Sequence, residues 1–141
     1  MVDGDPRSEY PLGTRRPDLV RTPSGRALSE LTLDALRAGS ISPADVRATP
    51  ETLRRQSAIA RATGRTQLAE NLERAAELAG VPDDIILDIY TALRPGRSTA
   101  EELEAWAVRL ESELDARGVA TFVREAREAY EARGLFARDA S

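Results

Sequence analysis

The residue types that carry most enzyme chemistry are missing from this sequence. Its 141 residues include no His and no Cys, and every basic residue is Arg. Without His or Cys the chain cannot form a Ser-His-Asp triad, a cysteine nucleophile or the usual zinc site. Without Lys it has no Walker A phosphate loop. We therefore expect no catalytic residue, no cofactor-binding residue and no metal ligand in this chain.

Carboxylates are the remaining candidates for chemistry, and most of them have a structural explanation. Asp83 and Asp84 stand where a helix is predicted to begin, as do Glu101 and Glu102. A metal site is the alternative at Asp83 and Asp84. Acidic side chains in the first turn are stabilised by the helix dipole, and we favour this interpretation.

Arginines form three groups that could contact a charged ligand or partner. Arg15–Arg16 and Arg54–Arg55 could bind phosphate, although exposed arginines more commonly form weak surface ion pairs. Arg94 and Arg97 flank a Pro-Gly break after an apolar segment. Two alternatives stay open for Arg94 and Arg97: contact with a partner protein, or capping of the carbonyl groups that end the preceding helix.

The composition narrows the class of protein. Hydrophobic residues make up 41% and charged residues 31%, with a net charge of −4. Acidic and basic residues are interleaved, so the sequence lacks the basic stripe that nucleic-acid binding requires. No apolar run approaches the ~18 residues of a membrane helix, and residues 1–7 do not resemble a signal peptide. We expect a cytoplasmic protein that contacts neither nucleic acid nor membrane.

Residues 1–28 are predicted to form an extended N-terminal arm. Pro11, Pro17 and Pro23 interrupt the segment, and proline disfavours helix at the residue before it. The apolar residues of the arm could fold against the chain's own helices or lie on another subunit, and we slightly prefer the second alternative. The candidates for partner contact combine residues of the arm with the two arginines that flank the Pro-Gly break. They are Tyr10, Pro11, Leu12, Leu19, Val20, Arg94 and Arg97.

Residues 29–141 are predicted to form a helical domain. Thr32 and Gly39 bound a short helix, Thr49 and Gly64 bound a longer one, and further helices cover 66–79, 82–93, 98–117 and 119–133. Ser98 and Glu101 have the spacing of a capping box. The fold class is all-α, an irregular extended arm followed by a small open bundle of about five main helices. Its core should combine Leu, Ile, Val and Ala with four larger anchors: Tyr90, Trp106, Phe122 and Tyr130.

Several motifs occur in the order and spacing of one known family. They are SEYPL (8–12), TPSG (22–25), a long run from Thr49 to Pro95, RS-x-x-EEL (97–103) and FVREA (122–126). In this combination, the chain resembles the small subunit of adenosylcobalamin-dependent diol and glycerol dehydratases. The resemblance extends over residues 8–134, nearly the whole chain.

The resemblance implies a non-catalytic subunit of a lyase. In that family, large, medium and small subunits form a dimer of heterotrimers, a heterohexamer. Adenosylcobalamin lies between the large and medium subunits, and radical chemistry converts a 1,2-diol or glycerol to an aldehyde and water. The small subunit is helical and packs on the large subunit, so it is expected to stabilise the holoenzyme without holding the cofactor.

Some features depart from the family pattern. Arg replaces the Lys of relatives, Pro95–Gly96 stands where some relatives have an aromatic residue, and only residues 1–7 precede SEYPL. Some of these dehydratases reside in bacterial microcompartments, so this location is a second expectation. The short leader speaks against targeting through this chain. The main alternative function is a free-standing helical adaptor or regulatory protein.

Overall fold

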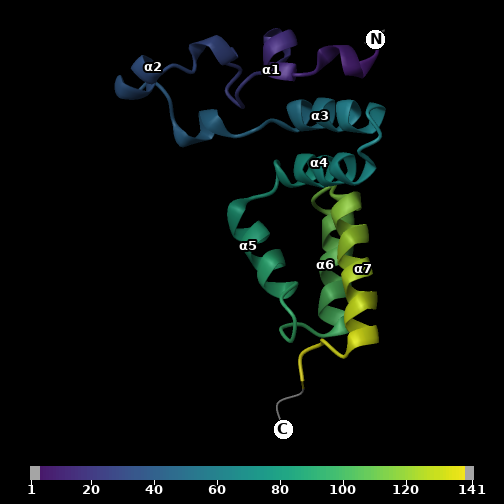
Figure 1. The fold of residues 1–141 in the computed structure, drawn as a ribbon. Coiled ribbons are helices and arrows are strands. Elements are labelled where there is room, and N and C mark those ends of the chain that lie inside the picture. Colours follow the sequence, from purple (N-terminus) through teal and green to yellow (C-terminus); the bar gives the residue numbers. More distant parts are fainter. Residues whose placement is uncertain (1–3, 139–141) are drawn as a thin grey trace. The chain divides into compact units, whose positions relative to one another are not determined.

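The structure is a computed structural model that describes residues 4–138. Within this range the chain forms seven α-helices and no strand, and its only ladder-like contact is an isolated bridge between Arg21 and Ala27. Five of the helices, α3 to α7, have ten residues or more. The predicted all-α class with five main helices is confirmed (Figure 1).

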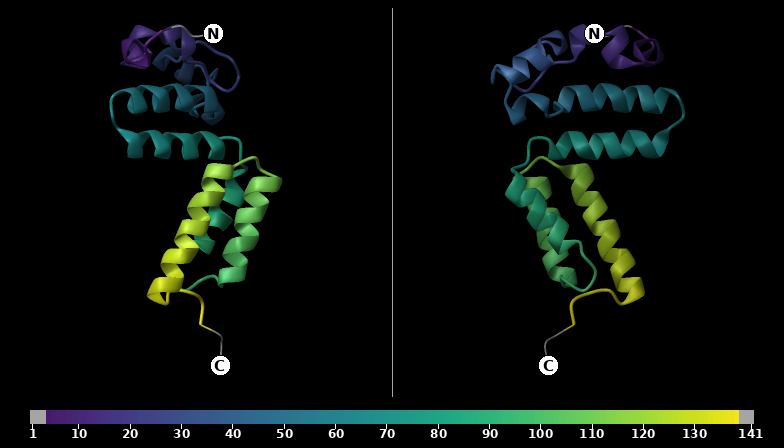
Figure 2. Two further views of the ribbon diagram at one scale, coloured as in Figure 1. Left: turned by 90° about the vertical axis from the view of Figure 1, so that its right-hand side faces the viewer. Right: turned by 60° about the vertical axis from the view of Figure 1, so that its left-hand side comes forward.

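The first compact unit spans Met1–Ala79 and is built around a helical hairpin. Helix α3 covers Pro50–Ala62 and α4 covers Thr66–Leu78, and the two lie side by side in both figures (Figures 1 and 2). The Thr49 hydroxyl accepts a 3.2 Å hydrogen bond from the Thr52 amide. Gly64 follows the hairpin's first helix with a φ of +78°, which glycine adopts without strain. Both predicted ends of α3 are confirmed.

The N-terminal segment is irregular but not extended, so this part of the prediction is wrong. It forms 3-10 turns at Pro6–Glu9 and Pro17–Leu19, with the one-turn helix α1 at Leu12–Arg15 between them. The φ value that proline imposes suits the first residue of a helical turn as well as extended chain. The Pro6–Glu9 turn contacts α3, and Leu12 is buried. The segment therefore folds against helices of its own chain.

The rest of the first unit connects this segment to the hairpin. It consists of a 3-10 turn at Leu28–Glu30, the short helix α2 at Leu33–Arg37 and a 3-10 turn at Pro43–Val46. Thr32 caps α2 by accepting from the Ala35 amide at 3.1 Å, as the sequence predicts.

The second compact unit spans Gly80–Ser141 and contains α5 (Asp83–Ala92), α6 (Ala100–Ser112) and α7 (Arg117–Arg133). Helices α6 and α7 form a second hairpin, and α5 contacts α6 (Figure 2). Its core is made of Val81, Ile89, Leu103, Ala107, Leu110, Ala116, Val119, Ala120 and Val123.

The predicted bounds of α6 need two corrections. The capping box is Thr99–Glu102 and not Ser98–Glu101: the Thr99 hydroxyl accepts from the Glu102 amide at 3.2 Å. The Ser98 hydroxyl instead donates to the carbonyl oxygen of Ala92, at 2.8 Å. Helix α6 ends at Ser112, five residues before the predicted end at residue 117.

The four aromatic residues expected in the core do not fill it. Tyr90 is 69% exposed and Phe122 is 42% exposed. Trp106 is half-buried, with the Arg109 guanidinium 5.2 Å from its ring centroid. The half-buried Tyr130 uses its hydroxyl to donate a hydrogen bond to the Leu93 carbonyl. The largest fully buried side chains are Leu103, Leu110 and Val123.

The boundary between the two compact units follows Ala79. The reason is that the N-terminal segment packs with α3 and α4, while α5 begins a separate core. The division into an arm of residues 1–28 and a helical domain of residues 29–141 stays a prediction. Among residues 4–138, no helix is both long and apolar enough to span a membrane.

Candidate docking surfaces

Several carboxylates that were candidates for chemistry serve structural contacts instead. Residues 4–138 contain no group of three or more acidic side chains placed to hold a metal ion. Asp83 and Asp84 lie in the first turn of α5. Glu102 accepts from the Thr99 amide at 2.9 Å, which satisfies a free donor at the start of α6.

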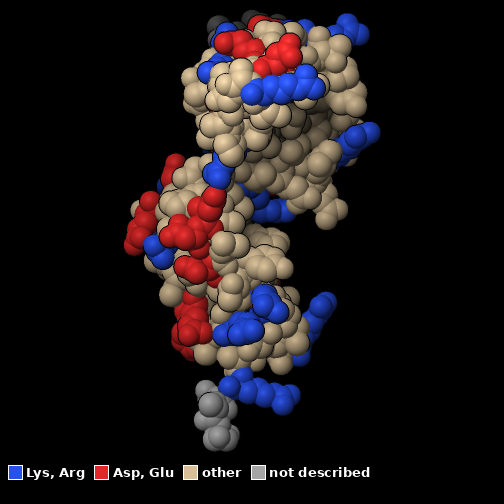
Figure 3. Space-filling view, turned by 90° about the vertical axis from the view of Figure 1, so that its left-hand side faces the viewer, with Lys and Arg blue, Asp and Glu red and all other residues tan. Residues whose placement is uncertain are grey.

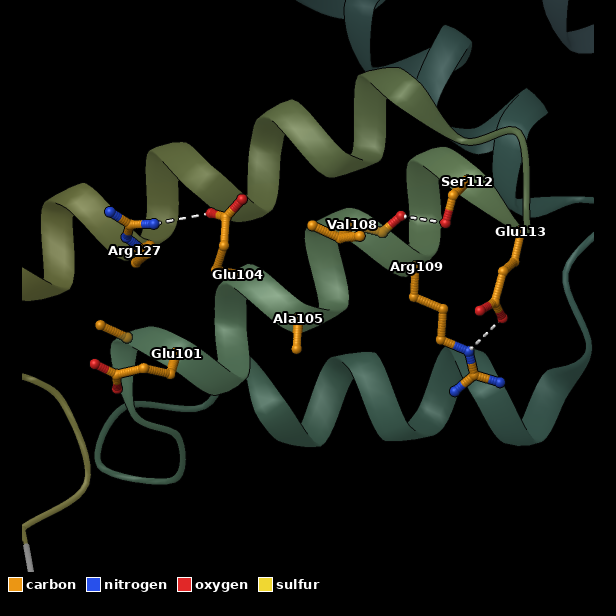
Figure 4. A pocket seen from close by; sticks show the side chains of 9 residues that line it. Glu101, Glu104, Ala105, Val108, Arg109, Ser112, Glu113 and Arg127 are labelled. Carbon is orange, nitrogen blue, oxygen red and sulfur yellow. Dashed lines mark hydrogen bonds and ion pairs between the residues drawn. The ribbon is translucent and has the colours of Figure 1, made fainter.

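An ion-pair network joins α6 to α7. Glu104 of α6 accepts from Arg124 Nε at 3.0 Å. It also accepts from Arg127 Nη1 at 2.8 Å (Figure 4). Arg124 also donates to Glu111 at 3.0 Å, and this hydrogen bond lowers the pKa of the Glu111 carboxyl. The pKa of Arg124 is raised, mainly by its hydrogen bonds to Glu111 and Glu104. These pairs fix the register of the hairpin.

A shallow hollow lies beside this network on the exposed side of α6. Figure 4 shows Glu101, Glu104, Ala105, Val108 and Arg109 of α6 along it, with Arg127 reaching across from α7. Arg109 and Glu113 pair at 3.3 Å at one end of the hollow. Nearly every charged group around the hollow has a partner in its own chain, so the hollow offers no free acid–base pair.

The arm residues predicted to contact a partner divide into buried and exposed ones. Leu12 is 6% exposed and belongs to the core of the first unit. Leu19 and Val20 are half-buried, and Pro11 is exposed. Tyr10 is 64% exposed, so its ring is the largest apolar surface that the arm presents.

Tyr10 borders an open, mostly apolar groove of about 480 Å³. The groove is formed by the arm on one side and the α3–α4 hairpin on the other, with Arg65 as its only charged lining residue. Its lining is Tyr10, Pro11, Leu12, Gly13, Gln56, Ile59, Ala60, Thr63, Arg65, Leu68 and Leu72. Surfaces of this kind, an apolar floor with a polar rim, suit protein contact.

Hydrogen bonds hold the arm and its following turn in place. Arg16 pairs with Asp18 at 2.8 Å and with Glu9 at 3.5 Å. Asp45, which is 8% exposed, accepts from the Ser24 hydroxyl at 2.5 Å and the Ser42 amide at 2.8 Å. The Ser24 hydrogen bond is the main reason that the pKa of Asp45 is lowered. This contact ties the TPSG motif to the turn that precedes α3.

The role of Asp45 in joining Ser24 to the turn before α3 was not predicted from the sequence. The sequence contains a signal for this role. Ser42 and Asp45 have the spacing of a capping box, with Ser42 as the cap and Asp45 as the third residue of the turn. The contact with Ser24 spans 21 residues and could not be read from local spacing.

The break between α5 and α6 is a fixed loop. Gly96 donates to the Leu135 carbonyl at 2.8 Å, and Ala137 donates to the Ser98 carbonyl at 2.9 Å. Arg94 and Arg97 are exposed, and neither side chain bonds to another residue of the described chain. The Ala92 carbonyl is capped by Ser98, so the alternative in which these arginines cap α5 is not supported.

These observations define a class of protein: an all-α chain without a described metal cluster, whose exposed apolar and arginine side chains in residues 4–138 suit contact with a partner. Known proteins agree with this class. The dehydratase small subunit family matches residues 6–137. The chain therefore belongs to the dehydratase small subunit family.

Two relatives are similar over most of their length. The propanediol dehydratase small subunit of Salmonella typhimurium is 51% identical over 119 residues, which cover 84% of this chain and 69% of that protein. The propanediol dehydratase small subunit of Citrobacter freundii is 49% identical over 123 residues, covering 87% and 72% respectively. The predicted resemblance is confirmed.

Proposed function

We propose that this chain acts as the small subunit of an adenosylcobalamin-dependent diol or glycerol dehydratase, where it stabilises the assembly and takes no part in the chemical step. The observation that carries this function is the 51% identity, over 84% of the chain, to a propanediol dehydratase small subunit. Family membership over residues 6–137 supports a role within a larger enzyme. The adaptor alternative has no comparable observation in its favour.

The partners that we propose are a large and a medium dehydratase subunit, in a dimer of heterotrimers. A permanent interface of this kind buries more than ~2,000 Å² and is relatively apolar. The described chain exposes enough large apolar side chains to contribute: Tyr10, Leu33, Leu36, Val46, Leu68, Leu87, Tyr90, Val108 and Phe122. The groove beside Tyr10 joins two of them, Tyr10 and Leu68, on one surface.

The sequence has no imidazole or thiolate that could coordinate cobalt. We therefore propose that the other subunits hold the cofactor, and we assign no step of the reaction to residues of this chain.

The location that we propose is the cytoplasm, with residence in a bacterial microcompartment as the narrower alternative. Fractionation of a producing strain separates the two: a microcompartment enzyme sediments with the protein shell, whereas a dispersed enzyme stays in the supernatant.

An aldehyde assay tests the proposed function. The large and medium subunits are co-expressed with and without this chain, supplied with adenosylcobalamin, and assayed with propane-1,2-diol and with glycerol. We expect a stable three-subunit complex and full turnover only when this chain is present. If the chain neither co-purifies nor changes turnover, the proposed function is wrong.

A further inference from the structure

Four arginines stand at one end of the second unit. Arg94 and Arg97 belong to the loop between α5 and α6, Arg133 ends α7, and Arg138 follows in the C-terminal segment. The backbone hydrogen bonds from Gly96 to Leu135 and from Ala137 to Ser98 join these two stretches of chain. We call Arg94, Arg97, Arg133 and Arg138 the arginine cluster, and basic side chains gather at this end in Figure 3.

The arginine cluster contains four of the five arginines in residues 80–138 whose side chains have no described hydrogen bond or ion pair, and the fifth is Arg117. Arg109 pairs with Glu113, Arg124 with Glu104 and Glu111, and Arg127 with Glu104. Arg117 interacts electrostatically with Glu111. None of the four cluster side chains has a hydrogen bond or ion pair to another residue in 4–138, and all four are exposed.

Two carboxylates at the start of α6 are already in use. Glu102 accepts from the Thr99 amide, and Glu101 is stabilised by its contacts with the start of α6 and by Arg127. The cluster arginines bond to no carboxylate of residues 4–138, so their positive charge is available to a partner.

Four hydrogen bonds hold the loop that carries Arg94 and Arg97 in place. The Tyr130 hydroxyl donates to the Leu93 carbonyl, the Ser98 hydroxyl donates to the Ala92 carbonyl, and two backbone hydrogen bonds tie the loop to residues 135–137. Gly96 has a φ of +75°, a conformation that favours glycine. A rigid backbone lowers the entropy lost when side chains bind a partner.

We propose that the arginine cluster is a preorganised docking site for Asp and Glu side chains on a partner dehydratase subunit. The inference rests on the proposed function, because it names the contact by which the small subunit recognises its complex. Guanidinium groups bind carboxylates through paired, directional hydrogen bonds.

The charge of the rest of this unit favours a protein partner over a polyanion. Residues 80–138 contain twelve Asp and Glu against eight Arg, and acidic side chains follow one side of the unit in Figure 3. An extended polyanion such as DNA, or an anionic membrane, would meet this acidic surface and be repelled. A short acidic patch on a folded subunit, by contrast, can contact the cluster without meeting this acidic surface.

The experiment compares charge reversal inside and outside the cluster. Arg97→Glu and Arg117→Glu change the net charge equally, and both residues are exposed, but Arg117 begins α7 whereas the cluster lies where α7 ends. Each full-length variant is co-expressed with the large and medium subunits. The dissociation constant of the small subunit is measured by diluting the complex at low and at high salt, and circular dichroism checks that each variant is folded.

We expect Arg97→Glu to raise the dissociation constant about tenfold at low salt, Arg94→Glu with Arg97→Glu to raise it further, and Arg117→Glu to change it less than about twofold. Neutral Arg94→Gln with Arg97→Gln should weaken binding and flatten its salt dependence. Equal effects of Arg97→Glu and Arg117→Glu would overturn the proposal. If the unmodified chain forms no complex, the proposed function itself fails, and the two failures are thereby distinguished.

Two further measurements test whether the loop is preorganised and whether the cluster binds a protein in preference to a polyanion. Tyr130→Phe removes the hydroxyl that holds the loop and keeps every charge, so we expect a few-fold weaker binding with an unchanged salt dependence. An unchanged dissociation constant would contradict preorganisation. Cluster-dependent binding of the unmodified chain to duplex DNA or to vesicles of anionic lipid would overturn the choice of a protein partner.

Discussion

The Ser57 hydroxyl donates a 2.9 Å hydrogen bond to the carbonyl oxygen of Ala69, across the interface between α3 and α4. Both residues have no exposed surface. Small side chains at this point allow the two helix backbones to approach closely, and the hydrogen bond satisfies the hydroxyl group that this approach buries. The α3–α4 hairpin therefore depends on a contact with little room for change.

Ser57→Ala should lower the free energy of unfolding by about 1 kcal/mol, because it deletes this hydrogen bond and leaves the packing almost unchanged. Ser57→Leu should cost about 1–3 kcal/mol, since a larger side chain forces the helices apart. Urea denaturation of the purified chain, followed by circular dichroism, measures both. Ser29→Ala is the control, because Ser29 is exposed. Equal stability of Ser57→Leu and the unmodified chain would show that the helices are not in close contact.

Glu104→Gln should lower the Tm by a few degrees, because Glu104 pairs with Arg124 and Arg127 at once. The loss should shrink at high salt, which screens ion pairs at the surface. Glu113→Gln removes a single, more exposed pair with Arg109 and should change the Tm less. The prediction fails if the two variants melt at the same temperature at low salt.

Asp45 should make stability depend on pH in the acid range. Its pKa is lower in the folded chain than the ordinary value of 3.8, so the stability that it contributes is complete above pH 3.8 and is lost as the pH falls through the folded-state pKa. Asp45→Asn should therefore lower the Tm near neutral pH, with a gap that closes below pH 3.8. Thermal melts across this range test the sign, with the highly exposed Asp34→Asn as control. A gap that widens on acidification would contradict it.

Tyr10→Ala should weaken assembly without destabilising the chain. The side chain is 64% exposed, so its loss should change the free energy of unfolding by less than about 0.5 kcal/mol. Its effect should appear in co-purification with the large subunit and in cofactor retention.

Deletion of residues 8–28 is a stronger test of the arm. It should reduce assembly while α4 to α7 remain helical, but it also removes Leu12 from the core, so its stability must be measured alongside. An unchanged activity of the complex containing the truncated chain would show that the arm has no role in assembly.

A helix end with a single candidate cap could be predicted from the sequence. An end with two overlapping candidate caps could not. Thr49 and Gly64 bound α3 as expected. Before α6, both Ser98–Glu101 and Thr99–Glu102 have capping-box spacing, so spacing alone does not select one. The choice depends on the Ala92 carbonyl, which engages the Ser98 hydroxyl.

The pattern of apolar residues predicts where helices lie, but it does not show which apolar side chains a neighbouring helix will cover. Ile89 and Tyr90 are consecutive apolar residues of α5 and Tyr90 was expected in the core, yet Ile89 is 5% exposed and Tyr90 is 69% exposed. Likewise, Arg94 and Arg97 could be selected from the Pro-Gly break. Arg133 and Arg138 could not be added, because they join the cluster only through long-range hydrogen bonds of Leu135 and Ala137.

The small interior of each compact unit has a consequence for the life of the protein in the cell. Among residues 4–138, the largest side chains with almost no exposure are Leu103, Leu110, Val123 and the small Ser57, and each unit is centred on a single hairpin. Units of this size gain modest stability from their own cores. Copies that fail to assemble should therefore open often enough to be cleared by proteases, so the abundance of this subunit should follow the supply of its partners.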